Sequence, residues 1–508
     1  MPTLFTALRT HLPAAKTQKK KPILEPFGLE MLVTAKKPRK KRKEHIYRLS
    51  LTERFQRIHR SRATREIIVV GGGFAGLSAA YELSSVGYKV TVLEAQNRVG
   101  GRVKTLRKLI PGRVAEGGAE LIGSNHHAWL SYQHQFHLHL TDVLEPPNSP
   151  VVLAGWRLSS PEAAVLGAEF LKATRILDRE ARNINADTPW TSPKARSLDR
   201  LSLETKIGQI PVSELCKLAL REQLETDNGV PAERQSYLGV LAMIKGGGCK
   251  SYWADTEVYR CREGNDELAK QFRKRLPKGS VRFNSIVRKI NLKKRPVEVT
   301  LTGGETLTAD DVLLAAPPSV WKKIKITPAL PGSYQGQFGK NVKFLMDVGK
   351  NSWKPLSPAL TTDGPVDLTW QGTDQQPGPR ASLVCFSGSK DAETCKKWKN
   401  RRKEYLARTT AVYPGIIRGI RSSKFMDWIG NKWTRGSYSF PAPGEVTTTA
   451  PLLRKPFEKH LHFSGEHTCN AFVGYMEGAL QSGLRVAEAL AKRDKVIAGA
   501  ITSHRTGN

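Results

Sequence analysis

The sequence predicts an α/β fold, and three features along its 508 residues support this prediction. The first is a strand–helix–strand unit over residues 66–94. The second is a group of strands over 281–316, and the third is a strand followed by a helix over 461–491. Strands that alternate with helices in this way are typical of a parallel sheet covered by helices.

The opening unit begins with Ile67–Val70, a continuous apolar run of the kind found in parallel strands that are buried on both faces. Leu77–Val86 carries small and aliphatic residues on one face, as an amphipathic helix does, and Gly87 ends it. Lys89–Glu94 follows as a second strand. The sequence therefore predicts a compact βαβ unit.

The turn between this strand and helix has the pattern Gly71-x-Gly73-x-x-Gly76. The first glycine permits a tight turn, the second lets the backbone approach a pyrophosphate, and the third lets the helix pack close to the strand. The free N–H groups of the helix N-terminus attract phosphate, and Glu94 can hold both hydroxyls of a ribose. We therefore expect a Rossmann-like dinucleotide site, and the carboxylate disfavours the 2′-phosphate of NADP.

The middle of the chain is mixed. Residues 126–245 are rich in helix formers, whereas 281–316 read as strands with a hairpin turn at Gly303-Gly304. Residues 326–440 alternate between the two types and contain many Pro, Gly and Trp. We find no internal repeat.

The composition, 39% hydrophobic and 25% charged, fits a soluble globular protein. It excludes collagen, a disordered chain, a disulfide-rich mini-protein and a polytopic membrane protein. The formal net charge is +35, of which residues 66–508 carry +21. A basic surface favours anionic partners such as nucleic acid, anionic lipid or acidic substrates, and it disfavours a polycationic partner.

The six cysteines include no C-x-x-C pair and no zinc spacing, so we expect free thiols in a reducing compartment and a cytoplasmic protein. No apolar run is long enough to predict a transmembrane helix, and the N-terminus lacks the pattern of a secretory signal. The histidines between His126 and His139 do not converge as ligands, so we expect no metal site.

Residues 1–65 contain 18 Lys or Arg against 4 Asp or Glu, including the basic run at 36–43. This stretch is either a patch for nucleic acid or an anionic surface, including a nuclear address, or a solvated extension without a partner. An over-extended gene start would have the same appearance. We expect a basic, disordered tail at 1–65 and a short tail at 496–508.

Two further motifs resemble those of FAD enzymes with two dinucleotide-binding domains, and this resemblance favours FAD over NAD. Arg98–Arg102 places two glycines between arginines directly after the second strand, where Arg102 can contact a diphosphate through two N–H groups. Near the other end, His462–Thr468 contains the pair Gly465-Glu466, and a helix opens near Gly474. The N-terminus of that helix would stabilise negative charge on a reduced flavin.

Together these motifs resemble the flavin-containing amine oxidase family, which includes monoamine, polyamine and L-amino-acid oxidases. The resemblance covers about residues 66–492 and includes Glu116–Glu120 and a segment around Lys343. It implies a Rossmann-like FAD-binding domain built from three chain segments, with an inserted α+β substrate-binding domain. We place the FAD-binding domain at 66–130, 250–320 and 430–495, and the substrate-binding domain at 131–249 and 321–429.

The resemblance also implies which residues contact FAD. These are Gly71, Gly73, Phe74, Ala75, Gly76, Glu94, Ala95, Gly100, Gly101, Arg102, Gly118, Ala119, Glu120, Val287, Gly465, Glu466, Tyr475 and Met476. Monoamine oxidases bond a cysteine to the flavin in a segment similar to Arg435–Pro441, where this chain has Ser437. Because a hydroxyl cannot form that thioether, we expect FAD to be bound non-covalently.

The resemblance implies three catalytic residues. Lys343 is similar to the family lysine that is hydrogen-bonded through water to flavin N5 and assists reoxidation by O₂. Tyr438 and Tyr475 match the aromatic pair that guides the amine onto the flavin.

The predicted substrate residues are Glu120 and Asn125. L-amino-acid oxidases clamp the substrate carboxylate with an arginine, and the matching stretch Gly118–Asn125 contains none. Glu120 either holds a second ammonium, as on a diamine, or is a buried structural residue that pairs with Arg102.

We therefore expect an enzyme that oxidises a small amine, with hydride transfer from the α-carbon to flavin N5. O₂ would be the acceptor, and the products would be an imine or aldehyde, ammonia or an amine, and H₂O₂. The alternatives are an L-amino-acid oxidase of the same fold and a nucleic-acid-associated, demethylase-like flavoprotein that uses the basic tail. The chain could form an oligomer.

Overall fold

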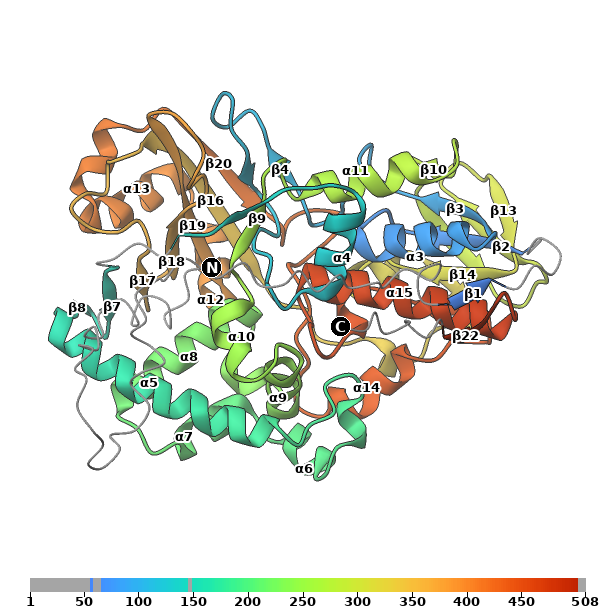
Figure 1. Cartoon of the computed structure of the whole chain (residues 1–508), viewed down its shortest axis with the longest axis horizontal. Helices are drawn as coiled ribbons and strands as arrows, with labels where there is room; N and C mark the ends of the chain where they lie inside the picture. Colours follow the sequence, from blue (N-terminus) through green and yellow to red (C-terminus); the bar gives the residue numbers. More distant parts are fainter. Residues whose placement is uncertain (1–54, 58–64, 145–148, 501–508) are drawn as a thin grey trace, which may run out of the picture.

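The computed structural model describes residues 55–57, 65–144 and 149–500 (Figure 1). The fold is mixed α/β, as the sequence predicts. The basic run at 36–43 and most of the predicted tails lie outside the described residues. Within the described part of the chain, every helix is too short or too polar to cross a bilayer.

A five-stranded sheet in which all neighbours are parallel occupies one half of the molecule. Its strands come from three separate stretches of the chain. In spatial order they are β10 (Val281–Arg282), β3 (Lys89–Leu93), β2 (Glu66–Val70), β14 (Asp311–Leu314) and β21 (Leu461–Phe463). The central strands are buried along most of their length because elements cover both faces of the sheet.

Helices cover one face of this sheet, where alternate residues such as Val69 and Leu313 join their core. These helices are α3 (Phe74–Ser85), α4 (His127–Gln135), α11 (Asp266–Arg275) and α15 (Met476–Arg493). The first and last of them lie side by side (Figure 1). Their backbones approach closely at Gly483, where an added Cβ would lie 2.0 Å from Ser78 Oγ.

A four-stranded sheet covers the opposite face, and Val70 and Val312 point into the core between the two sheets. Its strands, in spatial order, are β13 (Thr306–Ala309), β12 (Val297–Leu301), β11 (Val287–Asn291) and β15 (Lys325–Thr327).

The other half of the molecule contains a seven-stranded sheet. Its order is β20 (Ser422–Asp427), β16 (Asn341–Gly349), β19 (Arg380–Gly388), β18 (Leu368–Gln371), β17 (Thr361–Thr362), β7 (Val151–Leu153) and β8 (Trp156–Arg157). Two helices share an apolar core with this sheet, α12 (Ser389–Lys397) and α13 (Arg401–Val412).

A layer of helices lies below this sheet in Figure 1. It contains α5 (Ser160–Ala181), α6 (Ala195–Arg200), α7 (Leu203–Gln209), α8 (Glu214–Asn228), α9 (Tyr237–Gly246) and α10 (Lys250–Asp255). Helix α14 (Glu445–Leu453) packs against it. The longest of these helices, α5, begins with a capping box between Ser159 and Glu162.

Short elements complete the chain. The small sheets pair β4 (Thr105–Leu106) with β5 (Ala115–Glu116), and β6 (Leu140–Asp142) with β9 (Tyr259–Cys261). The 3₁₀ turns are η2 (Pro189–Thr191), η3 (Ala232–Arg234), η4 (Pro318–Lys323), η5 (Gly332–Tyr334), η6 (Pro414–Arg418) and η7 (Glu466–Thr468).

Two of the predicted domain boundaries divide packed units. The boundary at 130/131 lies inside α4, whose Trp129 and Tyr132 both belong to the core under the helix face of the parallel sheet. The boundary at 320/321 separates β15 from its parallel partner β11. Both errors arise because tertiary contacts, which composition does not reveal, hold these segments in place.

The predicted tails also need a correction. Strand β1 (Phe55–Arg57) pairs in antiparallel fashion with β22 (Ile497–Ala500), although both were expected to lie in tails. The pairing joins backbone groups more than 400 residues apart in the chain, so no local sequence pattern predicts it.

Asp311 connects strand β14 to strand β21 and to helix α15. Its carboxylate accepts hydrogen bonds from Arg493 Nη1 at 2.9 Å and Nη2 at 2.6 Å, and it lies 3.1 Å from His462 Nε2. Burial by itself raises the pKa of Asp311, but Arg493 and His462 outweigh it and hold the pKa below its ordinary value.

We predict that Asp311→Asn lowers the free energy of unfolding by about 2 kcal/mol at neutral pH, because the partly exposed Arg493 loses one of its two charged partners and keeps only Asp494. The depressed pKa means that this contribution is present above the unfolded-state pKa of about 4 and is lost on acidification. Urea denaturation of both proteins at neutral and acidic pH measures it. Glu305→Gln, which breaks an exposed pair with Arg282, should leave stability unchanged.

Candidate functional site

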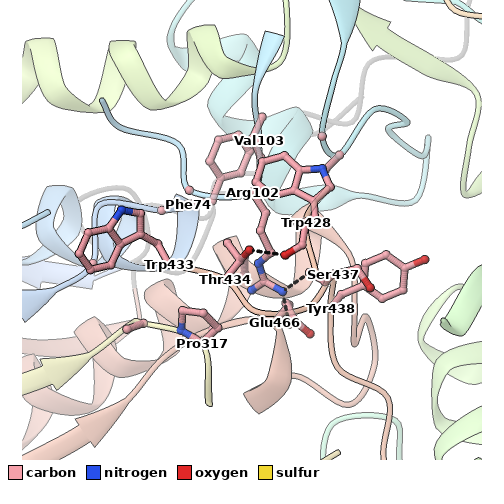
Figure 2. Close-up of a pocket in the computed structure, with 18 of the residues that line it drawn as sticks. Phe74, Arg102, Val103, Pro317, Trp428, Trp433, Thr434, Ser437, Tyr438 and Glu466 are labelled. Carbon is pink, nitrogen blue, oxygen red and sulfur yellow. Dashed lines mark hydrogen bonds and ion pairs between the residues drawn. The ribbon is translucent and has the colours of Figure 1, made fainter. Parts of the chain in front are cut away.

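A cavity of about 600 Å³ is lined by residues from both halves of the molecule. Most residues predicted to bind FAD and all three predicted catalytic residues line it. The predicted residues on its wall are Gly71, Gly73, Phe74, Ala75, Glu94, Ala95, Gly100, Gly101, Arg102, Gly118, Ala119, Glu120, Val287, Lys343, Tyr438, Gly465, Glu466, Tyr475 and Met476. Figure 2 shows several of the side chains that face this space.

The glycine turn leaves one end of the cavity lined by bare backbone. Gly71 has a φ of +115°, and a Cβ on Gly76 would lie 2.1 Å from the carbonyl oxygen of Gly71. Gly76 does not line the cavity; it permits the close approach of α3 to β2. Gly101, with a φ of +58°, would bring a Cβ to 3.3 Å from the Cα of Gly73. Glycine at these positions therefore permits the tight turn and the close packing that leave bare backbone at this end of the cavity.

Glu94 is held in place by the same turn. Its Oε2 accepts the N–H of Gly72 at 2.7 Å, and its Oε1 accepts the N–H of Gln96 at 2.8 Å. Burial raises the pKa of this carboxyl. Each oxygen keeps a free lone pair, so the carboxylate can also accept hydrogen bonds from two hydroxyls of a ligand.

Arg102 connects the N-terminal and C-terminal motifs. Its Nη1 donates to Glu466 Oε1 at 2.8 Å and to the carbonyl oxygen of Ser437 at 2.8 Å (Figure 2). The same glutamate accepts the N–H of Gly474 at 2.9 Å, just before α15. No side chain caps the N-terminus of α15, and Met476, its first residue, lines the cavity. An electron-rich ring edge could therefore face the helix N-terminus.

Lys343 is buried in β16, although in so basic a chain a lysine is normally exposed. Its ammonium donates to Glu120 Oε2 at 2.8 Å and to the carbonyl oxygen of Gly118 at 2.9 Å. A third contact, to the carbonyl oxygen of Glu116, is long at 3.5 Å. One N–H is therefore only weakly engaged, on a residue that lines the cavity.

Glu120 is the centre of a buried ion network, which agrees with the alternative of a buried structural residue but gives it partners other than Arg102. Besides Lys343, it accepts Arg260 Nε at 2.8 Å and Trp370 Nε1 at 2.8 Å. Arg102, the partner expected from the sequence, binds Glu466 instead. Two cations and an indole N–H already bind Glu120, so its charge is compensated within the protein.

The network also fixes the charge of Glu120. Burial alone would raise its pKa, but the neighbouring cations Lys343 and Arg260 lower it to about 2. Arg260 in turn bonds Asp374, so two cations and two carboxyl groups balance in the protein interior. The residues from β9 and from the turn after β18 were missed from the sequence because they lie far from Glu120 along the chain.

Asn125, the other predicted substrate residue, does not line the cavity. Its amide donates to the carbonyl oxygen of Gly247 at 2.8 Å and to Thr256 Oγ1 at 3.0 Å. These bonds join the loop before α4 to α9 and α10, so the structure gives Asn125 a structural position.

Tyr438 and Tyr475 both line the cavity, and Tyr475 also packs against the core of the helical layer. Burial raises the pKa of each phenol well above its ordinary value, so both stay neutral. The ring of Tyr475 packs edge-on against His126, with ring centres 5.5 Å apart. This contact restricts the orientation that the tyrosine presents to the cavity.

Two acids on the same wall escaped the sequence analysis. Asp227 comes from the last turn of α8, and Glu257 follows α10. Both contribute to the electrostatic environment of Tyr438 and Tyr475. The sequence contained one signal that could have identified Asp227: it is an acid in the last turn of a helix, where the helix dipole disfavours negative charge. Among the described residues, no group of His, Cys, Asp or Glu forms a metal site.

We predict that Glu120→Gln destabilises the protein by about 3–5 kcal/mol at neutral pH, because Lys343 and Arg260 would stay buried with less than their compensating charge. With a folded-state pKa of about 2 against an ordinary 4.5, this contribution is present above about pH 4.5 and declines as the pH falls toward 2. Denaturant titrations at several pH values test it. A free energy of unfolding equal to wild type at pH 7 would contradict the network.

Comparison with known proteins agrees with this geometry. The flavin-containing amine oxidase of Oncorhynchus mykiss is 26% identical over 450 residues, which is 84% of this chain and 85% of the relative. Two solved structures share the fold over 85% of this chain. Cyclohexylamine oxidase from Brevibacterium oxydans has a TM-score of 0.77 at 23% identity and is covered over 100% of its length. Putrescine oxidase bound to putrescine has a TM-score of 0.76 at 24% identity and 99% coverage.

A family model described as flavin containing amine oxidoreductase matches residues 74–491, which is most of the chain. The matched region includes the residues of the cavity from Phe74 through Tyr475. It confirms the resemblance noted in the sequence, and the chain therefore belongs to the flavin-containing amine oxidoreductase family.

Proposed function

We propose that this protein is an FAD-dependent oxidase of small amines. One observation carries the proposal: a single cavity joins the glycine cradle and Glu94 to Lys343 and the two tyrosines. A cofactor bound in the cradle would thus reach a chamber with aromatic walls. The products would be an imine or aldehyde, ammonia or an amine, and H₂O₂.

The residues present fit FAD. The backbone of Gly71–Gly73 and the N-terminus of α3 would bind the diphosphate, and the carboxylate of Glu94 would bind the ribose. Val287 lies on the wall of the same end of the cavity, beside Ser285. The N-terminus of α15 would face the flavin ring.

The proposed FAD is non-covalent. Ser437 lines the cavity, and its hydroxyl donates to Asn341 Oδ1, so it faces β16. A serine oxygen is no substitute for the thiolate that forms a thioether. Arg102, Glu466 and the glycine backbone would therefore hold the cofactor through hydrogen bonds alone.

Bound there, FAD would supply the two-electron chemistry, accepting hydride from the α-carbon of the amine and passing the electrons to O₂. The protein contributes orientation and the exclusion of water. Tyr438 and Tyr475 present neutral aromatic surfaces to the amine nitrogen, and the apolar wall limits hydration. The weakly engaged N–H of Lys343 could order a water molecule in the cavity, as the resemblance implies.

The alternative of an L-amino-acid oxidase is weaker. Such an enzyme needs a cation for the substrate carboxylate, whereas the acids Asp227 and Glu257 line the chamber beside the tyrosines. Lys343, a cation on the same wall, is already paired with Glu120. The nucleic-acid-associated alternative depends on the basic tail, most of which lies outside the described residues.

Non-covalent binding predicts that denaturation releases the whole cofactor. After precipitation with acid, the yellow colour and the absorbance of free FAD should appear in the supernatant. Flavin fluorescence that stays with the washed pellet would show a covalent bond and contradict this assignment of Ser437.

Lys343→Met should slow reoxidation of the reduced flavin by O₂ tenfold or more, because a positioned charged contact contributes several kcal/mol, of which 1.36 is about a factor of ten. Stopped-flow absorbance of the folded, FAD-loaded fraction measures this rate. Lys424→Met, at an exposed position on the neighbouring strand β20, is the matched control. An unchanged rate in Lys343→Met would assign this lysine to structure alone.

A further inference from the structure

The chamber beside the tyrosines contains two carboxyl groups that the proposed reaction does not use. Asp227 and Glu257 both line the cavity. Together they raise the pKa values of Tyr438 and Tyr475, in addition to the larger effect of burial. The two acids therefore lie close enough to the tyrosines to set the local potential.

Asp227 is unusual because its polar atoms are not fully satisfied. Its Oδ2 accepts a hydrogen bond from Gln223, but its Oδ1 is buried and has no hydrogen-bond partner among the described residues. A buried oxygen without a partner is costly for the folded protein, and it points to a ligand that supplies the missing donor.

The surroundings of Asp227 make this cost larger. Burial raises its pKa, and the neighbouring Glu257 raises it further, since two carboxylates repel each other. The residue also lies in the last turn of α8, where no basic side chain offsets the helix dipole. A cation in the cavity would relieve all three effects, whereas an anion or an apolar group would relieve none.

The net charge of the protein gives a further reason to expect a cation at Asp227. Residues 66–508 carry a net charge of +21, which repels cations at long range. Asp227, whose pKa burial and Glu257 raise to about 8, becomes a carboxylate when a cation binds beside it and then opposes that field at the tyrosine end of the cavity. The unpartnered Oδ1 of Asp227 lowers the stability of the protein, whereas recognition of a cation would give this acid a function.

The chemistry of amine oxidation determines whether this cation can be the reacting nitrogen of the substrate. An ammonium held by carboxylates keeps its proton, and a protonated nitrogen has no lone pair to assist hydride loss from its α-carbon. The group at Asp227 must therefore differ from the reacting amine. We propose that Asp227 and Glu257 form a subsite for a second, non-reacting ammonium, so that the preferred substrates are diamines or longer polyamines.

This inference rests on the proposed function and names its substrate class. The decisive comparison uses pairs of amines that differ only in the distal group: 1,4-diaminobutane against pentylamine, and 1,6-diaminohexane against heptylamine. In each pair a methyl group replaces one ammonium at nearly constant length. We expect wild type to favour the diamine in kcat/KM for at least one pair.

Asp227→Asn keeps the size of the side chain and the bond from Gln223 but removes the charge. We expect it to lower the diamine-to-monoamine ratio of kcat/KM about ten- to a hundredfold, with activity on the monoamine largely retained. Glu222→Gln, on the same helix but away from the cavity wall, is the matched control and should leave the ratio unchanged. An unchanged ratio in Asp227→Asn would overturn the subsite.

Binding separates this inference from the proposed function. With the flavin chemically reduced under anaerobic conditions no amine is turned over, and calorimetry gives Kd for both members of each pair. Diamine preference that Asp227→Asn abolishes supports the subsite even if no amine is oxidised, an outcome that would reject the oxidase proposal alone. If Asp227→Asn fails to retain FAD, Glu257→Gln decides, and it should shift the same ratio in the same direction. Equal Kd values for diamine and monoamine in wild type would overturn the subsite.

Discussion

The buried network around Glu120 is the constraint on which the site depends. Its members come from β16, from β9, and from the loops after β5 and β18, which belong to both halves of the molecule. A charge buried without its partners would cost several kcal/mol, so the segments must meet in one arrangement. The network therefore fixes Lys343 at the cavity wall and holds the two halves of the molecule in one relative position around the cavity.

The same balance of charge explains why Glu120 is unsuited to substrate binding. A carboxylate that already accepts hydrogen bonds from Lys343, Arg260 and Trp370 has two buried cations to compensate its charge. Asp227 is the opposite case, since it lies on the wall with an oxygen that lacks a partner. Two acids of similar chemistry thus differ in role because of the donors around them. Charge compensation, more than residue type, distinguishes the structural acid from the one open to a ligand.

At the other end of the cavity, glycine backbone without side chains is as important as the ion network around Glu120. Glycines at the turn after β2 and at the second motif approach each other where any side chain would intrude. The N-terminus of α3 and Glu94 then define a groove suited to a pyrophosphate and a ribose. This end selects its ligand by shape and backbone donors, whereas the tyrosine end selects through aromatic surface and charge.

The sequence alone determined the features that depend on interactions between residues close together in the chain. Apolar runs, the spacing of Gly71, Gly73 and Gly76, and the acid at Glu94 predict a βαβ unit with a dinucleotide groove, because these depend on neighbours along the chain. Only the tertiary structure decided the partners of Glu120, the position of Asn125, and the presence of Asp227 in the cavity. Those depend on segments more than 100 residues apart, whose approach is set by the packing of the whole core.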